Sequence, residues 1–289
     1  MDVAILRVRS TKNRIIMHYG REQTDMITSS NNAKVKQVVQ WQTKAKERRK
    51  DHVFLAEGVR MCEEAPVKSV REVYLTEELE QKLRQNAQNG DTAFWDKLQQ
   101  TGYETVSPEV FAKMADTQTP QGILTVLEQP SYDLTQLLEQ PEPLFLILEN
   151  LQDPGNLGTM IRTGEGAGIT GVIMNSQTVD IFNPKTIRAT MGSIFRVPFV
   201  YVPELSPVLT QMHEKGIHTY AAHLKGKEYY DSFSFREPTA FLIGNEGNGL
   251  TKEISGQYLK IPMEGKVESL NASIAAALLM YEAHRQRKL

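Results

Sequence analysis

The second half of the chain contains six apolar runs of strand length that polar residues hardly interrupt. These runs are LFLILEN, GVIMN, RVPFVYV, HTYAAHL, TAFLIG and YLKIPM. Helical patterns between and after them are expected near 156–167, 184–191, 206–215, 249–256 and 270–286. A strand with one wet face alternates apolar and polar residues, whereas a strand covered on both faces is apolar throughout, as in parallel sheets. The pattern therefore predicts a parallel α/β sheet with helices on both faces.

The first half of the chain predicts a smaller α/β domain, in which short strands alternate with helices. Ser30 or Asn31 is expected to cap a helix that runs toward Arg49. Strands are then expected at 52–58, 70–76, 103–106 and 122–128, and helices from residue 59, over 77–100 and over 108–114. Such alternation within about 80 residues is typical of a small α/β domain.

Three prolines lie between these two halves, at Pro130, Pro141 and Pro143. Proline at this density interrupts both helix and sheet, which indicates a linker. Residues 1–25 show no clear periodicity and are predicted to be a poorly ordered extension. The predicted organisation is therefore an extension at 1–25, an N-terminal domain at 26–130, a linker at 131–142 and a C-terminal domain at 143–289.

Composition narrows the class of protein. Of 289 residues, 40% are hydrophobic and 24% are charged, as in an ordinary soluble globular protein. The longest apolar runs, near 144–148 and 274–280, are far shorter than the roughly 20 residues that span a bilayer. Cys62 is the one cysteine, which excludes an intramolecular disulfide and favours a reducing compartment, the cytoplasm. The six histidines show no metal-ligand spacing, and His218 and His223 are expected to be core or edge residues of a strand.

The net charge of −2 hides a basic stretch near the start of the chain. Its members are Lys34, Lys36, Lys44, Lys46, Arg48, Arg49 and Lys50. A second basic cluster, Arg285, Arg287 and Lys288, ends the chain. A charge run of this kind is either a solvated helix face or a patch that binds the phosphates of a nucleic acid. Composition leaves both interpretations open.

Three glycine- and asparagine-containing segments follow apolar runs in the second half. They are ENLQDPGNLGTMIRT at 149–163, FLIGNEGNGL at 241–250 and IPMEGKVESLNAS at 261–273. Glycine has no Cβ, so it lets the backbone approach a ligand closely. The carboxyl ends of parallel strands meet at one edge of a sheet, where ligands bind. The three segments therefore predict one small-molecule pocket.

The polar residues of these segments could do chemistry there, but each also has a structural alternative. Asn156 would cap the helix that carries Arg162, and Arg162 could simply pair with Glu165. Glu246 could be a solvent-facing turn residue. Ser269 or Asn271 would cap the last helix. The chain contains neither G-x-x-x-x-G-K-[ST] nor G-x-G-x-x-G, which disfavours an NAD- or nucleotide-dependent enzyme.

The order of the three motifs resembles one known family. The first motif is N-x-G-x-x-x-R-T, from Asn156 to Thr163. It is followed by GNEGxG after an apolar run, and then by IPM and ESLNAS before an apolar helix. This order resembles the SpoU (TrmH-like) family of the SPOUT superfamily. Its members are RNA ribose 2′-O-methyltransferases. The resemblance covers 143–289. Residues 52–128, with FLAEGVR followed by a strand–helix series, are similar to the substrate-binding domain that precedes it in many members.

The resemblance implies a fold, a cofactor and an assembly. The fold is a parallel α/β sheet whose C-terminal segment threads a deep trefoil knot, and members act as homodimers in which both protomers contribute to each site. The cofactor is S-adenosyl-L-methionine, held mainly by backbone groups. Its contacts are expected from Ile243, Gly244, Asn245, Gly247, Ile261, Pro262, Met263, Ser269, Leu270 and Ser273.

The resemblance also assigns catalytic residues. Arg162 corresponds to the catalytic arginine of the family. A guanidinium stays protonated in proteins, so we expect Arg162 to stabilise a developing 2′-alkoxide and a phosphate rather than to act as a base. Asn156 would hold the loop and the ribose, and Glu246 would orient Arg162 or Asn156. Ser269 and Asn271 would complete the pocket floor.

The expected partner is RNA, bound by the basic stretch between Lys34 and Lys50 and recognised at an exposed nucleotide. By analogy with family members that carry the added domain, large-subunit (23S) ribosomal RNA is the first expectation. The alternatives are a tRNA 2′-O-methyltransferase, or a non-catalytic RNA-binding or ribosome-assembly protein on the same fold. Neither a membrane nor a metal is expected to take part.

Overall fold

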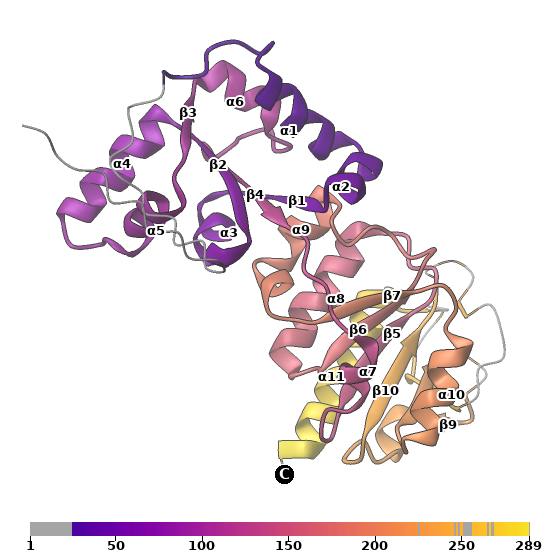
Figure 1. Ribbon diagram of the computed structural model, residues 1–289. Coiled ribbons are helices and arrows are strands. Elements are labelled where there is room, and N and C mark those ends of the chain that lie inside the picture. Colours follow the sequence, from indigo (N-terminus) through magenta and orange to yellow (C-terminus); the bar gives the residue numbers. More distant parts are fainter. Residues whose placement is uncertain are drawn as a thin grey trace, which may run out of the picture.

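The computed structural model contains two α/β units, which Figure 1 shows at upper left and lower right. The structure describes residues 25–224, 226–245, 247, 249–250, 256–264, 266 and 269–288. The extension predicted at 1–25 lies, apart from Asp25, outside these residues. Within the described ranges no helix is long and apolar enough to cross a membrane.

The first unit is a four-stranded sheet in the order β1-β4-β2-β3. Strand β4 is antiparallel to both β1 and β2, whereas β2 and β3 are parallel. The strands are β1 (Val53–Glu57), β2 (Val70–Thr76), β3 (Glu104–Val106) and β4 (Ile123–Glu128). The helices are α1 (Ala33–Thr43), α2 (Ala45–Asp51), α3 (Val59–Glu64), α4 (Glu77–Gln88), α5 (Ala93–Thr101) and α6 (Pro108–Met114). The predicted alternation of short strands and helices is present.

Local departures from the predicted helices have local causes. Asn32, rather than Ser30 or Asn31, caps α1, because its side chain accepts the Lys34 N–H. The helix expected to run on to Arg49 breaks at Lys44, which is extended (φ −124°, ψ 109°), so that α2 starts afresh. Between the prolines of the predicted linker lies a short helix, α7 (Leu134–Leu138), which proline density did not predict. It forms because Asp133 caps it and two of its leucines are buried.

The second unit is a seven-stranded sheet in the order β7-β6-β5-β10-β8-β11-β9, and every recorded pair is parallel. The strands are β5 (Leu144–Leu148), β6 (Gly171–Asn175), β7 (Phe199–Val202), β8 (His218–Ala222), β9 (Glu228–Tyr229), β10 (Thr239–Ile243) and β11 (Gln257–Lys260). The helices are α8 (Pro154–Ala167), α9 (Pro184–Thr190), α10 (Ser206–Glu214) and α11 (Ala272–Lys288). The predicted parallel α/β sheet is confirmed. The two-residue strand β9 was not predicted, and most of the helix expected near 249–256 lies outside the described residues.

Both faces of the second sheet are covered, which explains its continuous apolar runs. On β5, Leu146 packs in one cluster with Met160 of α8 and Met280 of α11. The neighbouring Ile147 packs in the other cluster, with Leu209 of α10. Alternate residues of one strand thus enter opposite cores, and neither face of the strand is left for water.

The two units share a packed interface. Phe54 of β1 packs against Phe182, which lies just before α9, with ring centroids 5.0 Å apart and the rings tilted by 35°. Three ion pairs also join them. They are Arg48–Asp180 at 2.6 Å, Arg196–Glu64 at 2.8 Å, and Arg188–Asp116. In Figure 1 this interface lies where α2 and β1 approach α9.

Candidate active site

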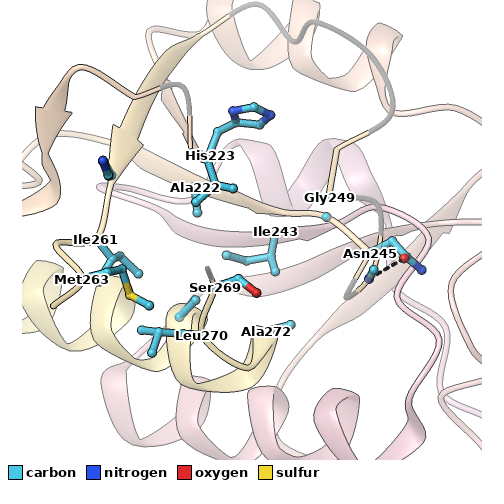
Figure 2. A pocket seen from close by; sticks show the side chains of 15 residues that line it. Ala222, His223, Ile243, Asn245, Gly249, Ile261, Met263, Ser269, Leu270 and Ala272 are labelled. Atoms are coloured by element: carbon cyan, nitrogen blue, oxygen red, sulfur yellow. Dashed lines mark hydrogen bonds between the residues drawn. The ribbon is translucent and has the colours of Figure 1, made fainter. Parts of the chain in front are cut away.

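A pocket of about 330 Å³ lies at the carboxyl ends of β8, β10 and β11 and is closed by the first turn of α11 (Figure 2). Its volume is in the range of small-molecule sites. Its wall is made of apolar side chains and glycine backbone from three loops. The lining residues are Ala222, His223, Leu224, Ile243, Gly244, Asn245, Gly247, Gly249, Lys260, Ile261, Met263, Ser269, Leu270, Ala272 and Ala275.

The loop after β10 can form only with glycine at position 244. A Cβ on Gly244 would lie 2.3 Å from the carbonyl carbon of Gly249, because the two backbones touch. Asn245 N donates to Gly249 O at 3.0 Å, and Gly249 N donates to Asn245 O at 2.9 Å. The Asn245 side chain in turn donates to Asn150 O at 2.9 Å. The second motif is thereby tied to the first.

The first and third motifs meet through two asparagines. Asn271 Nδ2 donates to Asn156 Oδ1 at 3.0 Å. Asn271 Oδ1 accepts from Ser273 N at 2.8 Å and from Ser273 Oγ at 2.7 Å, so Asn271, and not Ser269, caps α11. Asn271 also lies between the pocket residues Leu270 and Ala272. The structure therefore places the Asn156–Asn271 pair at the edge of the pocket.

The expectation that Asn156 caps α8 is wrong. The cap is Asp153, whose Oδ1 accepts the Asn156 N–H at 2.7 Å, and Pro154 occupies the first helical position. That hydrogen bond is the main reason why the pKa of the Asp153 carboxyl lies below its usual range. With Asp153 as the cap, the Asn156 side chain can face Asn271.

Arg162 lies on the exposed surface of α8 and does not line the pocket. Its guanidinium makes no hydrogen bond or ion pair with any other described residue. The alternative pairing with Glu165 is not seen, because Arg196 occupies that carboxylate and lowers its pKa. Glu246, the other charged catalytic candidate, lies outside the described residues.

Most of the predicted cofactor contacts do line the pocket. These are Ile243, Gly244, Asn245, Gly247, Ile261, Met263, Ser269 and Leu270. Pro262 does not, and Ser273 is buried and positions Asn271 instead. His223 was expected to be a core or edge residue, but it lines the wall opposite Leu270 (Figure 2). Its position at the carboxyl end of an apolar run was the available signal.

The basic stretch divides into exposed and buried members. Lys34, Lys36, Lys44, Lys46, Arg49 and Lys50 are exposed. Arg48 is not, since its side chain is only 4% exposed and donates to Asp180 Oδ2 at 2.6 Å and to Trp41 O at 2.7 Å. The structure thus removes Arg48 from the expected RNA contacts, because its guanidinium is buried and both of its Nη groups bond other parts of the protein.

The second unit has a pocket at the carboxyl edge of its parallel sheet and a polar pair beside that pocket. Together with the first α/β unit, this arrangement defines a class of enzyme that has a separate substrate-binding domain. Residues 143–281 match the model of the SpoU rRNA Methylase family, and residues 32–125 match an MRM3-like substrate binding domain. The chain is 34% identical to the 23S rRNA (guanosine(2553)-2′-O)-methyltransferase RlmP of Bacillus subtilis, over 88% of this chain and 97% of that protein. It therefore belongs to the SpoU family of RNA methyltransferases.

Solved structures of similar proteins agree with this family assignment. An AdoMet-bound rRNA methyltransferase from Sinorhizobium meliloti superposes with a TM-score of 0.78 at 28% identity, over 91% of this chain and 98% of that one. The SpoU methyltransferase AviRb from Streptomyces viridochromogenes, in complex with AdoMet, gives 0.75 at 27% identity, over 89% and 98%. The family cofactor is S-adenosylmethionine. The pocket fits it, because apolar side chains can cover an adenine ring while exposed glycine backbone offers hydrogen bonds.

Proposed function

We propose that the protein methylates a ribose 2′-hydroxyl in 23S ribosomal RNA. The observation that carries the proposal is the Asn156–Asn271 hydrogen bond, which joins two separate motifs beside the pocket. A protein that only bound RNA would not need a polar pair at the edge of a cofactor-sized pocket. S-adenosylmethionine supplies a methyl group on a sulfonium when it is bound there.

The residues of the chain then hold and polarise the nucleophile. Asn156 and Asn271 fix the ribose, so that its 2′-hydroxyl is aligned with the pocket, and alignment alone accounts for much of a rate enhancement. Arg162 remains charged and stabilises the developing 2′-alkoxide together with a neighbouring phosphate. Ser269 completes the pocket floor, and Glu246 orients Arg162 or Asn156.

The role of Arg162 needs a planar guanidinium that can contact two oxygens at once. Arg162→Lys is therefore expected to lower kcat by at least about tenfold, although the charge is kept. Near-normal turnover of Arg162→Lys with 23S RNA would contradict a two-oxygen contact.

The active molecule is proposed to be a homodimer. Ile274, Leu278 and Tyr281 are 50%, 37% and 49% exposed and follow one another along one face of α11. They line a groove of about 420 Å³ together with Tyr230, Ala277, Glu282 and Arg285. An exposed apolar stripe of this kind indicates an interface. A second copy would cover it beside Asn271, which lies at the start of the same helix.

Several features support a 23S target. RlmP and a Streptomyces viridochromogenes relative, 30% identical over 63% of this chain and 67% of that protein, are both named for 23S ribosomal RNA. The exposed basic residues of α1 and α2 are proposed to bind it. These residues are Lys34, Lys36, Lys44, Lys46, Arg49 and Lys50.

A ribosomal RNA substrate and a single cysteine favour a cytoplasmic location for the protein. A trefoil knot in the C-terminal segment and the domain limits 26–130, 131–142 and 143–289 belong to the same proposal.

The test is transfer of radiolabelled methyl from S-adenosylmethionine to 23S RNA transcribed in vitro, with Arg162→Ala in parallel. Label in an alkali-resistant dinucleotide, absent with the mutant, is the expected result, since 2′-O-methylation blocks alkaline cleavage at that nucleotide. Label found only in transfer RNA would replace the proposed target. Cofactor binding without transfer to any RNA would favour a non-catalytic RNA-binding protein.

A further inference from the structure

The buried residue Arg48 holds the basic helix α2 against the second unit. Its Nη2 bonds Asp180 in the loop that leads into α9, and its Nη1 donates to Gln42 O as well as to Trp41 O. The contact between the Phe54 and Phe182 rings strengthens the same junction. The exposed cations of α2 therefore lie at a defined place beside the start of α9.

Lys185, in the first turn of α9, lies between these cations of α2 and the active site. Its Nζ lies 3.4 Å from Asp153 Oδ2, the cap of α8. A Cβ on Gly155 would be 3.4 Å from Lys185 Cε and 3.7 Å from its Nζ, so the lysine end lies over the residue before Asn156. The lysine side chain is nevertheless 59% exposed.

Two glycines of α8 make this placement possible. At Gly158, a Cβ would lie 2.4 Å from Ala189 Cβ and 2.7 Å from Thr186 O. The two helices can therefore approach closely enough for α9 to bring its first turn beside that of α8. Since Gly155 also lacks a side chain, the end of Lys185 can lie against the first turn of α8 and still be exposed.

Three cations lie on α8 or α9, and a fourth, Arg196, follows α9; two of these four already pair with carboxylates. Arg188 pairs with Asp116, and Arg196 pairs with both Glu64 and Glu165 and lowers the pKa of those two carboxyls. Among the residues that the structure describes, the Lys185 side chain pairs only with Asp153, in an exposed contact, and the Arg162 side chain pairs with none.

The remaining two cations, Lys185 of α9 and Arg162 of α8, lie over the same face of α8. Gly155 and Arg162 are seven residues apart, which is about two helical turns, or about 10 Å along the axis. An exposed cation thus stands near each end of this face. Exposed ion pairs contribute little to stability, so Lys185 can exchange Asp153 for a phosphate at small cost.

We propose that the sugar–phosphate backbone of the substrate RNA runs from α2 over the start of α9 to the Asn156–Asn271 pair, and that Lys185 binds the phosphate nearest the reacting ribose. The inference rests on the proposed RNA substrate and adds a contact on the catalytic unit that the basic stretch of α1 and α2 does not include.

The test is the salt dependence of binding to in-vitro-transcribed 23S RNA for Lys185→Met. Loss of one phosphate contact should reduce the slope of log affinity against log salt by about 0.7–0.9, which is a five- to eightfold loss near 0.1 M salt. Lys185→Arg should restore both values. The matched control is Lys215→Met, because Lys215 is also an exposed lysine in a loose pair, 3.8 Å from Glu139, but follows α10. Cofactor affinity, measured by calorimetry, should be unchanged in all three variants.

A wild-type slope for Lys185→Met would overturn the inference and leave the proposed function intact. A loss of RNA affinity that comes with lower melting temperature or weaker cofactor binding, and that arginine does not rescue, would also overturn it. Lys185 would then serve only to support the cap of α8. If the unchanged protein showed no specific affinity for 23S RNA, the proposed target itself would fail.

Discussion

Asn271 uses the two ends of its amide for two separate tasks. The carbonyl oxygen caps α11 by accepting from Ser273, and the NH2 group donates to Asn156. A carboxylate could perform the first task but not the second, because it has no proton to donate. The same side chain therefore contributes to stability and to the site, and the two contributions can be separated by mutation.

Asn271→Asp should keep the helix cap and lose the active geometry. We expect a melting temperature close to that of the unchanged protein and a fall in kcat of about 100-fold, since a misplacement of about 1 Å can cost that much. Asn271→Ala should lose activity and, in addition, about 1 kcal/mol of unfolding free energy. Denaturant unfolding and methyl transfer to 23S RNA would check this. Full activity of Asn271→Asp would show that the amide donor is not required.

Gly244 tests whether the pocket depends on close backbone approach. Gly244→Ala should displace the Asn245–Gly249 turn and weaken S-adenosylmethionine binding by at least about tenfold, because an added Cβ would meet backbone that cannot move alone. The matched control is Gly247→Ala, where the nearest atom to a Cβ is Asn245 Oδ1 at 3.5 Å, an ordinary contact. Calorimetry would measure the affinity of both variants for S-adenosylmethionine. Equal affinities of the two variants would contradict the explanation that the pocket depends on close backbone approach at Gly244.

At the scale of elements, α11 serves the core and the surface at once. Ala276, Leu279 and Met280 are fully buried, whereas Ile274 and Leu278 on the opposite side are exposed. A helix that is apolar nearly all round is expected to be buried. The exposed side therefore needs a partner, and the proposed partner is a second copy of the chain.

Ile274→Glu should dissociate the proposed homodimer, because it puts a charge into an apolar interface. Light scattering should then give the mass of one chain, where the unchanged protein gives twice that mass. Val67→Glu is the control, since Val67 is 38% exposed but lies in the first unit, far along the chain from α11. An unchanged protein that is already monomeric would rule out the dimer.

At the scale of the whole molecule, Arg48 couples the two units. Arg48→Met should cost about 2–4 kcal/mol of unfolding free energy, since it leaves Asp180 without its buried partner. Arg71→Met, which removes a pair with 39% and 58% exposed side chains, should cost less than about 1 kcal/mol. RNA affinity should fall only for Arg48→Met, while cofactor binding persists in both. Equal losses of stability would contradict the coupling role of Arg48.

The two sheets, most of their strands and eight of the fifteen residues that line the pocket could be predicted from the sequence. Continuous apolar runs such as LFLIL can be stable only between two covered faces, and glycines such as Gly244 mark backbone that must come close. Both are local consequences of residue type, so they can be read along the chain. Elements as short as α7 and β9 have too few residues for any period to show.

Which polar residues meet depends on the tertiary structure. Arg48 and Asp180 are 132 residues apart, and Asn156 and Asn271 are 115 apart. In the sequence Arg48 looks like its exposed neighbours Arg49 and Lys50, because burial depends on what the rest of the chain places against a side chain. The Asp153 cap is local, since its side chain accepts the Asn156 N–H and Pro154 follows it, so this cap could have been predicted from the sequence. The choice of Lys185 as the cation beside the site, in contrast, follows from packing between helices. A local pattern cannot specify such packing, since the contacting atoms belong to distant parts of the chain.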